Sequence, residues 1–403
     1  MPHFLAARGR AAPLALGTEA MPQVQTALER RIRTRLERMQ SDGLQRTLRP
    51  PQGVDICSND YLQLAADPRL QQRMAAAVMQ LGCGSTGSRL LRGERAEFSA
   101  IEDRFARWVG AESALYFSTG YAANLAMLST FLEEGDTVLF DRLNHASLID
   151  AMRLGKAKKK IFPHADMDAL RQMLRAEPGE GQTYLVTESL FSMDGDIAPL
   201  LEYADLCRET GTALIVDEAH AVGVYGARGT GLVEEAGIAE DVFLTMRSAG
   251  KALGASGAFV SGPAWAIEYL VQRARTFLFS TAPPPSIAAA IDAALEILAA
   301  EPERRARLHA IIAHLRGLLA DAGLPVARDG SQIIPVVIGD NERAVQVAAA
   351  LQAEGFDVRA IRPPTVPEGT ARLRLSVNTG LDMPTLHRFA ACLQAALASE
   401  VHA

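Results

Sequence analysis

Three places in the chain put a reactive group or a glycine turn directly after a short apolar run. Asp217 ends one such run, and His220 lies three residues further on. Lys251 follows another run and stands between two glycines, which leave little bulk around its amine. Gly120 and Tyr121 follow a third run, where a helical pattern begins. A carboxylate, an amine and a glycine turn in these positions are candidates for one functional site.

Together these groups are the parts needed to hold pyridoxal phosphate. A lysine amine forms a Schiff base, an aspartate pairs with the pyridine nitrogen, and free amides at a helix start bind a phosphate. Each residue also has a plain alternative. Lys251 could be a solvated loop lysine, Asp217 a helix N-cap and His220 a polar residue near the surface. The combination therefore carries the cofactor prediction, and no single residue does.

The elements that position these residues alternate between strand and helix. Short apolar runs predict strands at 114–117, 137–140, 184–187, 213–216 and 242–245, with longer helical patterns between them. This alternation predicts an α/β fold with a mostly parallel central sheet covered by helices. Ligands of such sheets bind at the carboxyl ends of the strands. We therefore expect the three features to meet at one edge of the sheet.

The order of predicted helices and strands changes after the three prolines at 283–285. Helical patterns at 286–300 and 303–322 lead to a strand at 333–338, a helix at 342–354, a strand at 372–377 and a helix at 384–399. We predict three parts. These are an N-terminal extension, helix and arm over 1–60, a large cofactor-binding domain over 61–285, and a smaller α+β domain over 286–403. The helix is expected at 24–40, and residues 1–20 are expected to be a mobile extension.

Composition excludes several classes of protein. The 403 residues are 48% hydrophobic and 22% charged, as in an ordinary folded protein, and the net charge of −6 argues against a nucleic-acid or anionic-membrane partner. No apolar run reaches the ~18 to 20 residues of a membrane helix, and scattered arginines interrupt residues 1–20. We expect a cytoplasmic protein. The four cysteines are widely spaced and Asp194-Gly195-Asp196 is a turn signal, so we expect no metal site.

A second glycine motif points to different chemistry. Residues 82–87 match G-x-G-x-x-G, and Glu102 lies at about the distance of a ribose-binding acid. However, residues 68–81 are predicted to be helical where this motif requires a strand. A nicotinamide-dependent oxidoreductase is therefore a remote alternative, as is a non-catalytic binding protein with this fold. The lysine run at 156–160 is expected to be a solvated face, although it could meet the phosphates of coenzyme A.

Ordered motifs over most of the chain resemble the α-oxoamine synthases. These are pyridoxal phosphate enzymes of the aminotransferase-like fold type I that condense an amino acid with an acyl-CoA. The resemblance runs from about Cys57 to Leu386. Its landmarks are Ser58-Asn-Asp-Tyr-Leu, Gly84-Ser-Thr-Gly-Ser-Arg-Leu-Leu, Ser118-Thr-Gly-Tyr-Ala-Ala-Asn, Asn144-His-Ala-Ser, Glu188-Ser-Leu-Phe-Ser-Met-Asp-Gly-Asp, Val216-Asp-Glu-Ala-His, Ser248-Ala-Gly-Lys, Ser280-Thr281 and Arg362-Pro-Pro-Thr-Val-Pro. Two positions depart from the family pattern, Phe98 in place of a histidine and the bulky pair Met246-Arg247.

The resemblance implies a role for each matched residue. Lys251 would carry the cofactor as a Schiff base, with Asp217 at the ring nitrogen and His145 stacked on the ring. His220, helped by Ser192, would face the ring hydroxyl. The cofactor phosphate would be held by Gly120, Tyr121, Ser248 and, from a second subunit, Thr281. Substrate would be bound by Asn59, Thr365 and Arg374, the last through the amino-acid carboxylate. Arg372 and Arg374 alternate with leucines, so both guanidinium groups face one side of a strand.

The same resemblance narrows the substrates and partners. Residues 361–367 and the following Gly369-Thr-Ala-Arg are most similar to members that join L-alanine to pimeloyl-CoA or a pimeloyl carrier protein in biotin synthesis. Residues 220–226 are equally similar to members that use glycine and succinyl-CoA. Another member of the family, using glycine or serine with a different acyl-CoA, therefore remains the alternative. The family also implies a homodimer with shared active sites.

Overall fold

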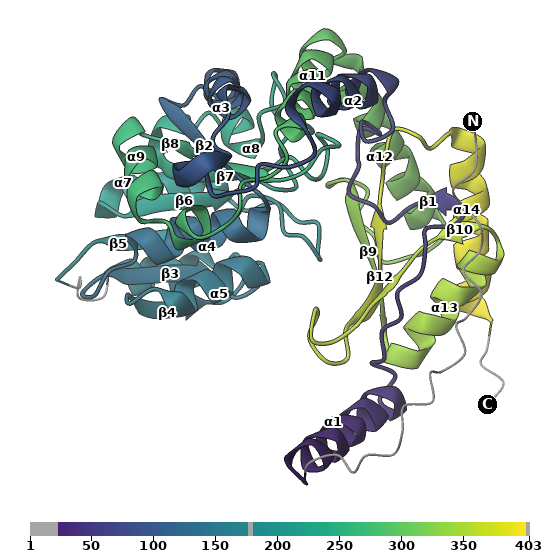
Figure 1. Ribbon diagram of the computed structural model, residues 1–403. Helices are drawn as coiled ribbons and strands as arrows, with labels where there is room; N and C mark the ends of the chain where they lie inside the picture. The colour runs from purple at the N-terminus through teal and green to yellow at the C-terminus, as the bar shows by residue number, and fades with distance from the viewer. Residues whose placement is uncertain (1–22, 176–179, 400–403) are drawn as a thin grey trace. The chain divides into compact units, whose positions relative to one another are not determined.

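The computed structural model describes residues 23–175 and 180–399, and it divides the chain into two units between Arg49 and Pro50 (Figure 1). The first unit contains helix α1 (Gln23–Ser41), at the position predicted from the sequence. Leu28, Ile32 and Leu36 follow one another at four-residue spacing along α1 and are exposed. The extension predicted over residues 1–20 lies outside the described residues.

The centre of the second unit is a seven-stranded sheet in the order β2-β8-β7-β6-β5-β3-β4. Its strands are β2 (Ser113–Phe117), β3 (Thr137–Asp141), β4 (Lys158–Phe162), β5 (Thr183–Glu188), β6 (Ala213–Asp217), β7 (Val242–Ser248) and β8 (Ala258–Gly262). Only β8 runs antiparallel to its neighbours. Since two antiparallel steps separate β2 from β7, the carboxyl ends of β2, β3, β5, β6 and β7 lie at the same edge.

Helices cover both faces of this sheet, and a separate hydrophobic cluster fills each side (Figure 1). Helices α3 (Ala96–Val109) and α7 (Leu200–Thr210) pack on one face, and α4 (Gly120–Phe131), α5 (Ala146–Leu154) and α9 (Ala264–Arg273) belong to the other. The remaining short or peripheral elements are α2 (Pro68–Leu81), the π-helix η1 (Arg89–Gly93), α6 (Met167–Arg175), α8 (Leu232–Glu235), η2 (Ala239–Asp241) and α10 (Arg275–Leu278). The predicted α/β fold with a mostly parallel central sheet covered by helices is confirmed.

A second, three-stranded antiparallel sheet follows in the order β11-β12-β9. It consists of β9 (Ile333–Gly339), β11 (Ala360–Ile361) and β12 (Ala371–Ser376), with α11 (Ser286–Ala300), α12 (Glu303–Asp321), α13 (Asn341–Ala353) and α14 (Met383–Ala398) around it. A short parallel pair, β1 (Val54–Asp55) and β10 (Phe356–Asp357), ties the arm after residue 50 to this region. Because α11 packs on α2 and α3, the domain boundary at residue 285 stays a prediction.

The described residues contain neither a membrane-spanning helix nor a cluster of metal-binding side chains. None of the described helices combines the length and the apolar character needed to cross a membrane. Within residues 23–175 and 180–399, no three His, Cys, Asp or Glu side chains come together in an arrangement that could hold a metal ion. Asp194 and Asp196 instead make separate ion pairs, with Arg372 and His164 respectively.

Candidate active site

Lys251 and His220 meet at the carboxyl edge of the large sheet. Lys251 lies in the loop after β7, and its Nζ is 2.9 Å from Nε2 of His220, which follows β6. Burial lowers the pKa of the Lys251 amine to about 8, although Asp217 and Glu188 act in the opposite direction. The pKa of His220 is held well below its usual range by burial and by the positive charges of Lys251 and Arg374. The pair therefore offers an amine that can lose a proton near neutral pH.

Asp217 is fixed at the end of β6 by two hydrogen bonds. Its Oδ2 accepts from Nδ2 of Asn124 on α4 at 2.8 Å, and its Oδ1 accepts from the amide of Ala219 at 2.8 Å. Asn124 also donates to Oγ of Ser147 at 2.8 Å, and this hydroxyl lies 2.8 Å from Nδ1 of His145. His145 is the N-cap of α5 and remains exposed. One amide side chain thus positions both the carboxylate and the imidazole.

Glu188 brings a second carboxyl group next to Asp217. The two residues are direct neighbours in the parallel pairing of β5 and β6, and Glu188 is 2% exposed. Burial and the charge of Asp217 raise the pKa of Glu188 well above its usual range, while Lys251 and the backbone amides of His145 and Ser192 oppose this. No role was predicted for Glu188 from the sequence, although its motif is one of the landmarks.

Arg374 and Arg372 point to the same side of β12 but have different partners. Arg372 pairs with Asp194 at 2.6 Å. Arg374 donates from Nη1 to Oδ1 of Asn59 at 3.1 Å and from Nε to the carbonyl of Ser192. Its Nη2 is buried without a hydrogen-bond partner among the described residues. Arg374 therefore retains a buried donor without a partner, as a carboxylate-binding residue requires.

The start of α4 provides a site for an anion. Thr119 caps the helix by accepting from the amide of Ala122, and the first two amides of a helix, here Gly120 and Tyr121, have no intrahelical acceptor. A side-chain carbon at Gly120 would lie 3.4 Å from Cε of Met246, so the glycine leaves room for the methionine. Ser248 is buried at the end of β7, where its Oγ accepts from the amide of Gly250.

The structure also locates the predicted residues Thr281 and Thr365. Both are exposed and lie in loops, Thr281 after α10 and Thr365 between β11 and β12. Their roles, Thr281 from a second subunit and Thr365 on the substrate side, stay predictions.

The two departures from the family pattern have structural explanations. Phe98 is fully buried, with its ring packed against Tyr116 and the guanidinium group of Arg89 4.8 Å from its centre. Met246 fills the space beside Gly120. Arg247 is 4% exposed and pairs with the buried Glu218 at 2.8 Å.

The competing dinucleotide motif lacks its structural context. Helix α2, and no strand, precedes residues 82–87. Glu102 lies on α3, pairs with Arg89 at 2.8 Å and accepts from the amide of Tyr116 at 2.8 Å. Because its carboxylate is already bound inside the protein, it is not available to a ribose. The geometry therefore disfavours the oxidoreductase alternative.

The donor set at the strand ends fits pyridoxal phosphate. It contains an amine with a lowered pKa, a fixed carboxylate, an exposed imidazole and a helix start with free amides. Glu188 Oε1 and Arg374 Nη2 are buried polar atoms without a hydrogen-bond partner within the described part of the chain. Buried polar atoms normally have partners, so these two indicate a site that is completed by a ligand.

The sheet and the strand-end cluster define a fold type I pyridoxal phosphate enzyme. The sequence model of the aminotransferase class I and II family matches residues 51–393, and the chain belongs to that family. It is 46% identical to the 8-amino-7-oxononanoate synthase of Anaeromyxobacter dehalogenans strain 2CP-1, over 91% of this chain and 95% of that protein. A crystal structure of 8-amino-7-oxononanoate synthase from Francisella tularensis matches with a TM-score of 0.75 and 29% identity, covering 85% of this chain and 97% of that one. A serine palmitoyltransferase solved with pyridoxal phosphate matches with a TM-score of 0.86 and 28% identity, covering 93% and 98%.

Proposed function

We propose that this chain condenses L-alanine with pimeloyl-CoA, or with a pimeloyl carrier protein, to form 8-amino-7-oxononanoate for biotin synthesis. In this reaction a carbon–carbon bond forms between Cα of alanine and the acyl carbon, the thiol leaves, and the alanine carboxyl group is released as carbon dioxide. The observation that carries this proposal is the 46% identity to a synthase of that name over 91% of the chain. The strand-end cluster supports it with the side chains that such a reaction needs.

Pyridoxal phosphate, when bound, supplies an aldehyde for the substrate amine and a ring that takes up negative charge from Cα. Lys251 holds the cofactor covalently, and its Nζ, once free, accepts the Cα proton of alanine. Asp217 would hold the protonated ring nitrogen, and His145 would lie against the ring. His220 and Ser192 would face the ring hydroxyl, and the amides of Gly120 and Tyr121 with the hydroxyl of Ser248 would hold the phosphate.

Arg374 binds the carboxylate of alanine through its open Nη2. Asn59 acts through Arg374, because its Oδ1 already accepts from Nη1 of that arginine. Thr365 contributes to the acyl side of the site from the loop before β12. Burial of Arg374 at 7% exposure strengthens its attraction for a carboxylate, since little water screens the charge.

A steady-state comparison of substrates tests this assignment. The chain, loaded with pyridoxal phosphate, is assayed for thiol release and product mass with alanine and pimeloyl-CoA, glycine and succinyl-CoA, and serine and palmitoyl-CoA. We expect kcat/KM to be highest for alanine and pimeloyl-CoA by more than about tenfold, or ~1.4 kcal/mol. A tenfold preference for either other pair would reassign the chain within the family, with the same reacting residues.

We also propose a homodimer in which Thr281 of one protomer reaches the cofactor phosphate of the other. Thr281 is exposed, and Phe279 nearby is 74% exposed. Leu90 and Leu91 on η1, which contacts α10, are exposed as well. Exposed apolar groups of this kind are typical of an interface between subunits. Sedimentation that finds a fully active monomer at assay concentration would contradict the dimer. A cytoplasmic location stays a prediction.

A further inference from the structure

A chain of four polar contacts joins Arg374 to Lys251. Arg374 Nη1 lies 3.1 Å from Asn59 Oδ1, and that oxygen lies 3.1 Å from the hydroxyl of Tyr61. The Tyr61 hydroxyl lies 2.7 Å from Nδ1 of His220, whose Nε2 lies 2.9 Å from Lys251 Nζ. The proposed carboxylate-binding arginine and the proposed base are therefore connected through Asn59, Tyr61 and His220, with Tyr61 in the middle.

We propose that Tyr61 is a positioning residue that fixes the tautomer of His220, with the proton on Nδ1 and the lone pair of Nε2 facing Lys251. This inference rests on the proposed function, because it assigns Tyr61 to that same site. Tyr61 touches neither substrate nor cofactor in this account. It acts through the imidazole and through Asn59.

The number of available protons sets the direction of every hydrogen bond between Arg374 and Lys251. Asn59 Oδ1 can only accept, so its contact with Tyr61 uses the one proton of the tyrosine hydroxyl. The tyrosine oxygen must then accept from His220, which places the imidazole proton on Nδ1. Nε2 is left as an acceptor for a proton of the Lys251 amine. The opposite arrangement would leave the oxygens of Asn59 and Tyr61 facing each other without a proton.

Burial keeps the protons of Tyr61 and His220 in these positions. Tyr61 is 0% exposed, and burial raises the pKa of its hydroxyl although the side chains of Arg374 and Gln332 act in the opposite direction, so the tyrosine keeps its proton. His220 stays neutral, because burial and the nearby positive charges lower its pKa. In a dry site a hydrogen bond cannot be exchanged for one with water, which makes a mispaired donor costly. A neutral imidazole between a fixed acceptor and an amine therefore keeps one tautomer.

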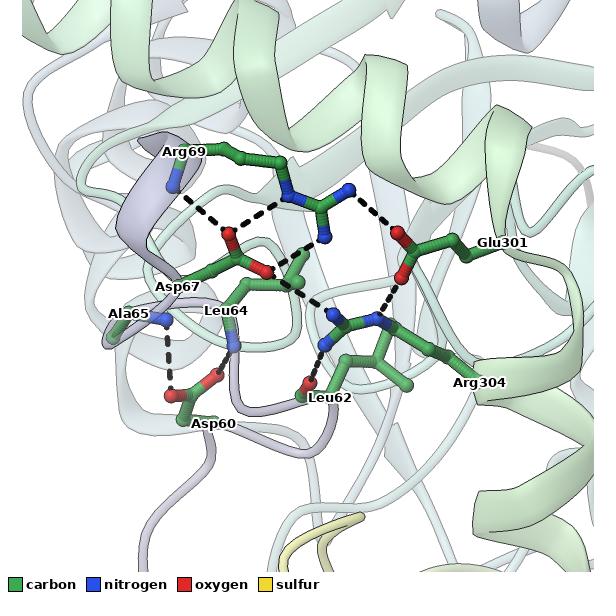
Figure 2. A network of polar contacts seen from close by, with 8 residues as sticks. All are labelled: Asp60, Leu62, Leu64, Ala65, Asp67, Arg69, Glu301 and Arg304. Carbon is green, nitrogen blue, oxygen red and sulfur yellow. Dashed lines mark hydrogen bonds and ion pairs between the residues drawn. The ribbon is translucent and has the colours of Figure 1, made fainter. Parts of the chain in front are cut away.

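The backbone around Tyr61 is held in place by the network in Figure 2. The Asp60 carboxylate accepts from the amides of Leu64 and Ala65, at 2.9 and 3.1 Å. Arg304 donates to the carbonyl of Leu62 at 3.1 Å and pairs with Asp67 at 3.0 Å. Because residues on both sides of Tyr61 are tied down, its hydroxyl has little freedom to leave the chain of contacts.

The same turn packs directly on the loop that carries Lys251. Gly254 has φ +63°, and a side-chain carbon there would lie 2.3 Å from the backbone nitrogen of Ala65. Only glycine allows this approach and this backbone conformation. Tyr61 and Lys251, two members of the contact chain, thus lie on segments that pack against each other.

The test measures the tautomer of His220 directly. The full chain is labelled with ¹⁵N-histidine, and long-range ¹H–¹⁵N spectra distinguish Nδ1–H from Nε2–H, with the His220 signals identified by their loss in His220→Gln. We expect Nδ1–H in the natural sequence. The spectra are recorded at pH 9.5, above the Lys251 pKa of about 8, because a protonated amine can only donate and would by itself hold Nε2 as an acceptor. At this pH Tyr61→Phe removes the acceptor of the Nδ1 proton and is expected to move that proton to Nε2, which can donate to the neutral amine.

Two further variants make the result specific. Asn59→Leu keeps Tyr61 but removes the acceptor of its proton, so the tyrosine can donate to Nδ1 and the tautomer should again change. Tyr225→Phe is the matched control. The Tyr225 hydroxyl donates to Gln332 Oε1 at 3.2 Å, and Gln332 holds the backbone carbonyl of His220, not its ring. This control should leave the tautomer unchanged.

Kinetics of the loaded enzyme give a second readout. Tyr61→Phe is expected to lower kcat with alanine by about tenfold or more while KM changes less than about threefold, and Tyr225→Phe to change both less than twofold. An unchanged Nδ1–H signal in Tyr61→Phe and Asn59→Leu, or an equal change in Tyr225→Phe, would overturn the proposal. Since the spectra need no substrate, they can support or refute the role of Tyr61 even if the chain proves to use another pair of substrates.

Discussion

His164 connects two loops at a position that the proposed reaction does not use. Its Nδ1 lies 3.0 Å from Oδ1 of Asp141, at the end of β3, and its Nε2 lies 2.6 Å from Oδ2 of Asp196, in the turn after β5. Asp141 also accepts from backbone amides, including that of Ala165 at 2.9 Å, so it keeps partners if the imidazole is removed. We predict that His164→Gln weakens the dependence of stability on pH.

The size of the contribution of His164 to the free energy of unfolding follows from its two ion pairs. Hydrogen bonds from Asp141 and Asp196 raise the pKa of His164 from 6.5 to about 10. Because the folded pKa lies above the unfolded one, the stabilisation is complete below about pH 6.5 and is lost as the pH rises towards 10. At ~1.36 kcal/mol per pKa unit the limit is about 5 kcal/mol. The side chain is 24% exposed, so we expect solvent screening to reduce this to about 2 to 3 kcal/mol.

Equilibrium urea unfolding of both proteins at pH 6.0 and pH 9.5 provides the assay. Lys251 changes the stability with pH in the opposite direction. Comparing the natural chain with His164→Gln cancels this contribution, because both proteins contain Lys251. Its folded pKa of about 8 lies below the ordinary value of 10.5, so between these values its contribution to folding improves as the pH rises. We expect the natural chain to be more stable than the variant at pH 6.0 by about 2 to 3 kcal/mol, and this gap to shrink below ~1 kcal/mol at pH 9.5. A gap of the same size at both pH values would refute the reasoning.

Three further substitutions and one control, Arg372→Lys, test the proposed site and its support. Asp217→Asn should keep the cofactor bound, by absorbance, while kcat falls at least about 100-fold, because an amide does not balance the charge of the ring nitrogen; near-normal turnover would remove Asp217 from its role. Arg374→Lys should raise KM for alanine about 100-fold through loss of the open Nη2 donor, whereas Arg372→Lys, whose partner is Asp194, should change it less than about threefold. An equal effect of both would contradict the assignment. Arg304→Gln should speed amide hydrogen exchange at Leu64 several-fold, as expected for a loss of about 1 kcal/mol; unchanged exchange would show that the network in Figure 2 does not hold this turn.

Most of the fold could be predicted because its inner strands are continuous apolar runs between helical patterns. All five predicted strands of the large sheet occur, each lengthened by one to three residues. The edge strand β4 was not predicted, since its sequence Lys-Lys-Lys-Ile-Phe is largely polar and exposed. Lysines on an edge strand discourage pairing with another chain. The same lysines interrupt the apolar run by which a strand is recognised in the sequence. β8 was not predicted either, because its five residues include only a short apolar stretch.

The site could be predicted only where a residue follows its own strand. Asp217, His220 and Lys251 come directly after β6 and β7, and the parallel sheet brings them together. Tyr61 lies 159 positions from His220 along the chain, and Asn124 lies 93 positions from Asp217, so no local pattern links them. The choice of Arg374 over Arg372 likewise depends on Asp194 pairing with one of them. The landmark motifs contained these residues but could not show their contacts.

The most direct test of the central claim is to find the lysine that holds the cofactor. The sequence has five lysines, four of them within residues 156–160 and the fifth at position 251. Lys158 and Lys159 are exposed on β4, at the edge of the sheet. Borohydride reduction of the loaded protein, followed by peptide mass spectrometry, distinguishes these two regions without ambiguity. We predict a pyridoxyl phosphate group on Lys251 that disappears in Lys251→Ala, and attachment to the lysines of residues 156–160, or to none, would contradict the proposed site.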